Sequence, residues 1–197
     1  MMTSPNKSRP VYAPLDADPR GTEHWFITSG ATDQDRARAV AALSRVAPLQ
    51  VWVVQADAPR ADADPLHALA EAPRRFDSEE GLLAALEQAM RDASIGVRIY
   101  ALGSEPFIWS VHQLAARYAI AAEAVRVAHS GGLFRRVYCV HCRALNERVT
   151  SNVVACAGCG RHLFVRDHFS RRLAAFMGVQ ADAEMPGELP EREQIYT

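Results

Sequence analysis

The chain has 197 residues, of which 49% are apolar and 23% are charged, so it is long and apolar enough to bury a core. Its formal net charge is -1, so no overall field attracts nucleic acid or a membrane surface. No apolar run reaches the roughly 18–20 residues of a membrane-spanning helix, and residues 1–14 lack the apolar stretch of a secretory signal. We therefore expect a cytoplasmic protein, in which four cysteines indicate metal or redox chemistry more than disulfides.

Short apolar strands alternate with amphipathic helices over residues 24–129. Strands are expected at 24–28, 50–55 and 97–102, and helices at 33–46, 78–93 and 106–118. Residues 122–129 are expected to form a further helix or strand. Strands that alternate with helices form a parallel sheet with helices on its faces. The sequence therefore predicts a small Rossmann-like α/β domain over residues 22–130.

Two segments of this half lack hydrophobic periodicity. Residues 1–21 carry four prolines and are expected to form an extended N-terminal arm, disordered or laid on a partner. Residues 56–77 carry three more prolines among alternating Ala and Asp, and are expected to form a loop.

The Gly131-Gly132 pair separates a shorter, strand-rich segment from the α/β half. Strands are expected at 133–138, 149–155 and 163–166. A helix is expected at 168–177, because Asp167 can cap it, four apolar side chains share one stripe and Gly178 follows its end. Residues 131–180 are therefore predicted to be a compact module with a C-terminal helix. Residues 181–197 form an acidic tail, expected to be irregular or bound to a partner.

The four cysteines form two C-x2-C pairs separated by thirteen residues: Cys139, Cys142, Cys156 and Cys159. Each C-x2-C turn places two thiolates on one side, and two such turns joined by a hairpin complete a tetrahedral site of the zinc-ribbon type. Zinc is favoured, although a rubredoxin-type iron site has the same ligands, because rubredoxin-like turns usually contain proline and these do not. A closed four-cysteine site has no open position for water, so we expect a structural metal and no catalytic residue here.

Three histidines are candidate ligands by type alone. His141 and His162 lie beside the cysteines, but four thiolates already complete the shell, so both are expected to lie outside it. His112 falls on the helix expected at 106–118, where packing or hydrogen bonding is a simpler role than ligation of haem.

The run YALGSEPF at residues 100–107 resembles the motif of ferredoxin-reductase-type pyridine-nucleotide domains, in which a strand ends in Cys-Gly-Pro-x-Pro before a helix. Leu102 takes the place of the cysteine at the hydride-transfer site, and Ser104 takes the place of the first proline. The first turn, SGATD at 29–33, has a single glycine, and Asp33 would repel phosphate. We therefore expect a Rossmann-like scaffold that has lost its nucleotide site, with no cofactor-binding residues.

The runs LFVRDHFSRRL at 163–173 and MGV at 177–179 resemble the small subunit of bacterial dimethylamine monooxygenase. The resemblance covers about residues 24–190, and within it the four cysteines match the family's metal-binding positions. It implies an α/β half, a zinc-binding module and a heteromeric complex. In that complex a haem-containing subunit oxidises dimethylamine with O2 to methylamine and formaldehyde, and an NADPH-dependent reductase subunit with flavin and an iron–sulfur cluster supplies the electrons.

The sequence thus predicts a non-catalytic, zinc-binding subunit, with haem, flavin, iron–sulfur cluster and NADPH held by its partners. Two alternatives remain open. One is a stand-alone zinc-ribbon regulator that binds nucleic acid, because residues 130–172 contain eight arginines against two acids. The other is a rubredoxin-like electron carrier between reductase and oxygenase.

Overall fold

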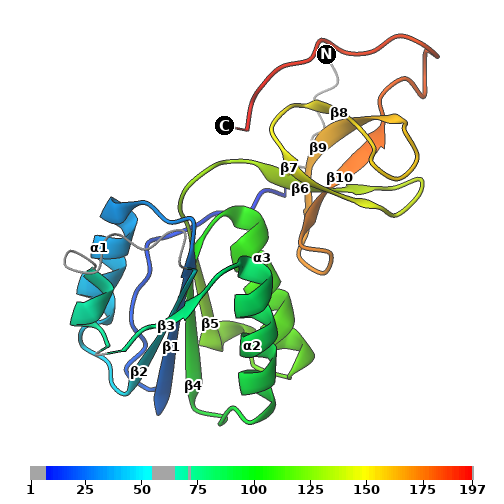
Figure 1. Cartoon of the computed structure of the whole chain (residues 1–197). Helices are drawn as coiled ribbons and strands as arrows, with labels where there is room; N and C mark the ends of the chain where they lie inside the picture. The colour runs from blue at the N-terminus through cyan, green and yellow to red at the C-terminus, as the bar shows by residue number, and fades with distance from the viewer. Residues whose placement is uncertain (1–7, 55–64, 71, 197) are drawn as a thin grey trace. The chain divides into compact units, whose positions relative to one another are not determined.

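The computed structural model describes residues 8–54, 65–70 and 72–196, which fall into two compact units (Figure 1). Residues 12–131 form the first, here called the α/β unit. Residues 132–196 and residues 8–11 form the second, here called the ribbon unit. The chain therefore passes between the units twice, once after Val11 and once after Gly131.

The α/β unit is built on a five-stranded, fully parallel sheet in the order β3-β2-β1-β4-β5. The strands are β1 (Glu23–Ser29), β2 (Leu49–Val54), β3 (Arg74–Phe76), β4 (Val97–Gly103) and β5 (Val125–His129). This is the strand order of a Rossmann-like sheet, so the predicted fold class is confirmed.

Strand β3 was not predicted, because it falls in the segment 56–77 that the sequence assigned to a loop. It has three residues, two of them arginines, and carries no alternating pattern. Its partner β2 defines it: Arg74 pairs with Trp52, and the Arg74 guanidinium stacks 3.8 Å from the centre of the Trp52 ring. Residues 56–64 and 71 of that predicted loop lie outside the described residues.

Helices cover both faces of the sheet. On one side lies α1 (Asp33–Leu43), and on the other lie α2 (Glu79–Arg91) and α3 (Glu105–Arg117) (Figure 1). Two short 3-10 helices, η3 (Pro65–Ala68) and η4 (Ala122–Ala124), complete the unit. The three predicted helices are confirmed, although α1 ends three residues early, and residues 122–129 form η4 followed by β5.

The described residues of the N-terminal arm pack against the folded chain. Residues 12–21 lie on the α1 side of the sheet, where Leu15 and Ala17 pack against the same core cluster as Ala39 of α1 and Tyr100 of β4. An Arg126 Nη donates to the Asp16 carbonyl over 2.7 Å. The expectation of a disordered arm is therefore wrong for these residues, and contact of the arm with a partner stays a prediction. The arm covers the β4–β5 half of this face, which no helix covers.

A buried carboxylate fixes the arm. Asp18 is 2% exposed and accepts hydrogen bonds from Arg20 (2.8 Å) and Arg98 (3.0 Å). Its backbone N–H donates to the Tyr100 hydroxyl, which in turn lies 3.1 Å from Nδ1 of His24. Hydrogen bonds from Arg20 and Arg98 hold the pKa of Asp18 well below its usual range, against the burial that would raise it.

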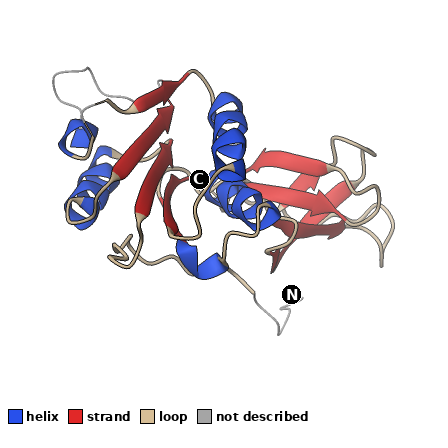
Figure 2. Ribbon diagram, turned by 90° about the horizontal axis from the view of Figure 1, so that it is seen from below, coloured by secondary structure: helices blue, strands red, loops and turns tan. Residues whose placement is uncertain are grey.

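The ribbon unit consists of a second five-stranded sheet, in the order β7-β6-β10-β9-β8, and has no helix among the described residues (Figure 2). Its strands are β6 (Arg135–Cys139), β7 (Leu145–Val149), β8 (Val153–Ala155), β9 (His162–Ser170) and β10 (Ala175–Gln180). β6 and β10 pair in parallel, and the other neighbours pair antiparallel.

The helix predicted at 168–177 is wrong, because this segment is the turn of the β9–β10 hairpin. Phe169 and Phe176, which would share a helical stripe, instead pair across the two strands with their rings 5.0 Å apart. Asp167 caps no helix: its carboxylate binds Arg9 and lies 3.1 Å from an Arg135 Nη. Ala174 takes a positive φ of 48° in the turn, which ends any helical path.

The acidic tail is irregular, and part of it lies against its own unit. Tyr196 is buried, and the Arg135 guanidinium sits 3.7 Å from its ring centre and 3.8 Å from that of Phe176. The Asn152 side chain accepts from the Glu193 N–H and donates to the Glu191 carbonyl. The tail thus covers the turn between β7 and β8. Among the described residues no helix is long and apolar enough to cross a membrane.

The arm contact gives a first prediction. Asp18→Asn leaves the half-buried Arg98 guanidinium without its anion, so we expect the melting temperature to fall by roughly 5 °C or more. Because the folded-state pKa of Asp18 is depressed, this stabilisation is present in full above the unfolded pKa of about 3.9 and fades as the pH falls below it. Thermal unfolding of both proteins between neutral and acidic pH measures the gap.

Asp16→Asn is the matched control. Asp16 binds Arg126 from the same arm, but its side chain is 88% exposed, so its loss should leave the melting temperature nearly unchanged. Equal effects of the two substitutions would show that Asp18 does not anchor the arm.

Candidate metal centre

The two C-x2-C turns have the same backbone hydrogen bonds. In the first, the Cys139 N–H donates to the Ala144 carbonyl (2.9 Å) and the Arg143 N–H donates back to the Cys139 carbonyl (2.9 Å). In the second, the Cys156 N–H donates to Arg161 (2.8 Å) and the Gly160 N–H donates to Cys156 (2.9 Å). Each first cysteine is therefore bonded to the residues four and five positions later. The repeated geometry presents both cysteines of a pair on the inner side of the turn.

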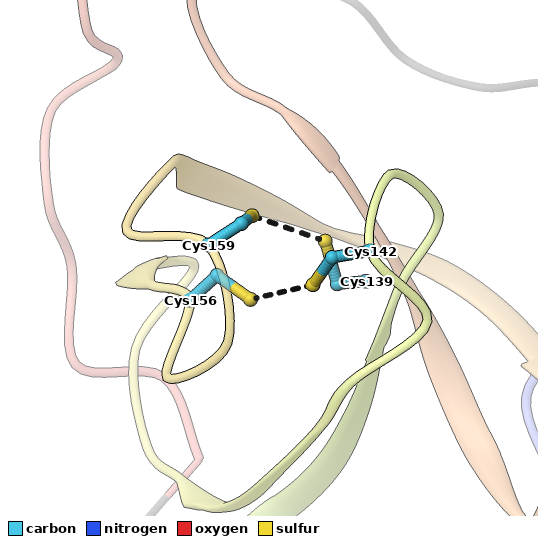
Figure 3. Close-up of side chains that lie close together, drawn as sticks. All are labelled: Cys139, Cys142, Cys156 and Cys159. Carbon is cyan, nitrogen blue, oxygen red and sulfur yellow. Dashed lines mark hydrogen bonds between the residues drawn. The ribbon is translucent and has the colours of Figure 1, made fainter.

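The four sulfur atoms meet between the turns (Figure 3). All lie within 4.8 Å of one another, and two contacts join the two turns: 3.5 Å for Cys142–Cys156 and 3.9 Å for Cys139–Cys159. Four sulfurs bound at ~2.3 Å around a tetrahedral centre lie ~3.8 Å apart. The separations therefore fit a metal, and they are too long for a disulfide. Among the described residues this is the one histidine, cysteine or carboxylate cluster so arranged.

The residue after the second cysteine of each pair turns the chain back with a positive φ. It is Arg143 in the first turn (φ 66°) and Gly160 in the second (φ 73°). Gly158 serves a different purpose, because a Cβ there would lie 2.7 Å from the Ala144 side chain and 3.0 Å from the Cys142 sulfur. Glycine at 158 thus lets the second turn approach the first.

Asn146 holds the two turns in register, and sequence reasoning missed it. This side chain is 5% exposed on β7. Its oxygen accepts from the Ala157 N–H (2.8 Å), and its amide donates to the Val137 carbonyl (3.2 Å) and lies 3.8 Å from the Cys156 sulfur. A lone asparagine in a strand gives no sequence signal, because its partners lie nine to eleven residues away.

The thiols around this centre differ in acidity. Burial opposes ionisation of Cys156, but hydrogen bonds from the Cys159 and Gly158 N–H groups and from neighbouring thiols outweigh it and lower its pKa to about 6. The Ala144 N–H favours ionisation of Cys142, but burial and the neighbouring thiols prevail and raise its pKa to about 12. Without a cation, charge is thus favoured on Cys156 and opposed on Cys142.

The histidines lie outside the sulfur cluster. Nδ1 of His141 is 2.7 Å from an Arg161 Nη, and the His162 side chain is exposed on β9. His112 lies on α3 with its ring 5.0 Å from that of Trp109. The structure therefore brings together the four predicted cysteines and none of these three histidines.

The turn expected to have lost its nucleotide site is closed by the protein itself. The Thr32 N–H at the start of α1 donates to the Ser130 hydroxyl (3.0 Å), and the Asp35 carboxylate accepts from that hydroxyl (2.7 Å) and from Thr32 Oγ1 (2.8 Å). A Cβ at Gly131 would lie 2.5 Å from the Gly30 carbonyl oxygen, so the loops after β5 and β1 are in contact. The α1 N-terminus therefore presents a carboxylate where a dinucleotide would place its phosphates.

Three arginines of the ribbon unit make contacts with side chains of the same unit. Arg135 is buried between two rings, Arg136 pairs with Glu147 (2.6 Å), and Arg148 stacks 4.3 Å from the Phe134 ring centre. Phe169, one of the aromatic side chains that suggested a base-stacking platform, is buried. These contacts favour a structural role for the aromatic and basic residues over a nucleic-acid surface.

Comparison with known proteins matches both units to domains of one family. The family model "Dimethylamine monooxygenase subunit DmmA-like, N-terminal domain" matches residues 5–125, and its C-terminal counterpart matches residues 136–179. The heme-dependent oxidative N-demethylase delta subunit of Ectopseudomonas mendocina (strain ymp) is 31% identical over 179 residues, 91% of each chain. The crystal structure of full-length CYP116B46 from Tepidiphilus thermophilus gives a TM-score of 0.43 at 20% identity. That match covers 66% of this chain and 19% of the other, too weak a likeness to establish a common fold.

Asn146 provides the second prediction. Asn146→Ala leaves the buried Ala157 N–H without an acceptor, so we expect a loss of about 1–3 kcal/mol in the free energy of unfolding. The cysteines should also react faster with a thiol reagent, because the second turn is no longer held against the first. Leu145→Ala truncates an exposed neighbour on the same strand and is the control. Unchanged thiol reactivity in the Asn146 variant would contradict the role assigned to this side chain.

Proposed function

We propose that this chain, which belongs to the DmmA-like family of dimethylamine monooxygenase subunits, is a metal-stabilised, non-catalytic subunit of an oxidative N-demethylase complex. The observation that carries the proposal is the closed cluster of four cysteine sulfurs in a chain that matches its relative over 91% of both lengths. The cluster explains how the ribbon unit is held, and the relative is by name the delta subunit of a heme-dependent demethylase.

The proposed ligands are Cys139, Cys142, Cys156 and Cys159, and the proposed metal is zinc. Four thiolates suit zinc, and a shell made only of cysteines has no open position to activate water. The metal would link the turn between β6 and β7 to the turn between β8 and β9, which belong to different hairpins of one sheet. The folding free energy supplied by such sites is on the order of 10 kcal/mol. The same ligands suit iron, so a rubredoxin-like carrier is the second candidate, favoured by the matching hydrogen bonds of the two turns.

The proposal that the chain is non-catalytic is supported by the α/β unit. Asp35 and Ser130 fill the α1 N-terminus, and Leu102, the last residue but one of β4, stands where the resembled family has a cysteine. We therefore place NADPH, flavin and iron–sulfur chemistry in a reductase subunit and haem in an oxygenase subunit. The partners would convert dimethylamine and O2 to methylamine and formaldehyde.

In such a complex this chain would contribute surface. The two units present separate faces joined by two chain segments, and a stable interface needs only about 1,600 Å² in total. The ribbon unit depends on its metal for folding in this proposal, so metal loss would remove one of those faces.

The metal assignment gives the third prediction. Elemental analysis of the purified chain should find about one zinc per chain, and Cys156→Ser should lose it because three thiolates no longer close the shell. His141→Ala is the matched control, since this residue is adjacent in the turn but bonded to Arg161, and it should retain the metal. A red protein with iron would identify the rubredoxin-like alternative. Full metal content in the Cys156 variant would contradict the ligand assignment.

The role in the complex gives the fourth prediction. This chain alone should release no formaldehyde from dimethylamine, and the oxygenase and reductase subunits without it should fall to near background. Adding the native chain or its His141→Ala variant should restore NADPH-dependent release, whereas Cys139→Ser should not. Full activity without this chain would show that it is dispensable, and activity of the chain alone would show that it is catalytic.

A further inference from the structure

The α/β unit contains a cavity of about 230 Å³ on the α1 side of its sheet. Its floor includes Leu102 at the end of β4 and Ala128 at the end of β5, one wall is α1 with Arg38, and the other is the arm with Tyr12 and Leu15. All of these residues belong to one unit and none is near the cysteine cluster in the chain. The cavity therefore does not depend on the function proposed above.

The fold explains why a cavity forms here. A helix has a diameter of about 10–12 Å, whereas extended strands lie within about 4.9 Å of one another, so an extended arm fills less space than a helix beside α1. The gap lies at the carboxyl ends of the strands, beside the point between β1 and β4 where the strand order reverses. Open α/β sheets bind their ligands at this position.

The lining excludes a phosphate ligand at the start of α1. The Asp35 carboxylate, which lines the cavity, already accepts from Ser130 (2.7 Å) and from Thr32 (2.8 Å), and these hydrogen bonds lower its pKa. The Thr32 and Asp35 N–H groups, which a phosphate would use, donate to side-chain oxygens instead. Both hydroxyls bind Oδ2 of Asp35, and its Oδ1 lies 3.4 Å from an Arg38 Nη.

The guanidinium N–H groups of Arg38 are the donors that this cavity offers to a ligand. Asp35 is its one side-chain partner among the described residues, over a long 3.4 Å contact from a single Nη, and the side chain is 65% exposed. A guanidinium has five donors in a planar fork that fits a carboxylate at two points. Beside it, Leu102, Ala128 and Leu15 offer an apolar surface, and Tyr12 lies with its ring 5.8 Å from that of His129.

We propose that this cavity binds a small carboxylate with an apolar body, about the size of benzoate, which pairs with the Arg38 guanidinium and lies over Leu102 and Ala128. The volume is below the roughly 300–1,000 Å³ of sites for drug-sized ligands, so a dinucleotide does not fit. The positive charge of Arg38 favours a carboxylate over a neutral or cationic group, and the apolar floor favours a ligand whose remaining atoms are apolar.

Benzoate is the probe, titrated into the full-length chain and followed by NMR of the methyl groups. We expect saturable binding with a dissociation constant on the order of 1 mM, and shifts confined to Leu102, Ala128 and Leu15. Arg38→Gln should weaken it about tenfold or more, because the paired charge is lost, and Arg38→Lys should fall between the two. Arg45→Gln removes an exposed arginine just beyond α1 and should leave binding unchanged.

Two further probes of the same shape test the selectivity. Benzamide, which is neutral, should bind at least about tenfold more weakly than benzoate, and benzylamine should not bind. Three results would overturn the proposal: no saturable binding of benzoate, equal affinity in the Arg38→Gln variant, or preference for benzylamine, which would make Asp35 the anchor. None of these outcomes bears on the metal content or on demethylase activity.

Discussion

Four sulfur atoms within 4.8 Å of one another impose the strongest constraint on this chain. Thiolates at that distance repel one another unless a cation lies between them, and as thiols they satisfy each other with weak hydrogen bonds only. The ribbon unit nevertheless brings them together with two identical backbone turns, a glycine that permits close approach and a buried asparagine that joins the turns. These features together bring four candidate metal ligands to one point.

In the α/β unit, the N-terminal arm covers a part of the sheet that no helix covers among the described residues. A sheet with α1 on one side and two helices on the other leaves half of one face without a helix, and that half carries Arg98, Tyr100 and Arg126. The arm supplies what this polar surface lacks, because Asp18 provides an anion for the arginines and Leu15 an apolar contact for the core. In each unit a terminal segment thus covers a surface that the helices and strands leave open. The arm covers half of one face of the α/β sheet, and the tail covers the turn between β7 and β8.

The parts of this architecture that were predicted from the sequence are those with local signals. Alternating strands and helices predicted the parallel sheet, and the cysteine spacing predicted the two turns. The errors share a different cause. The stripe of Phe169 and Phe176 fits a helix as well as a hairpin, and the choice is made by β6, which pairs with β10 from over thirty residues away. Strand β3 and Asn146 likewise depend on partners elsewhere in the chain, which composition and periodicity do not reveal.

Both units close positions where related architectures carry chemistry. A metal held by the four cysteines would have no open coordination position, and the start of α1 holds its own carboxylate and hydroxyl where a nucleotide phosphate would bind. This closure supports the proposed role, in which the chain contributes surface to a complex and not catalytic groups. A cavity lies between the arm and α1, where the extended arm and not a second helix covers the sheet. The arm that covers this half of the sheet therefore also forms one wall of a concave, partly charged surface.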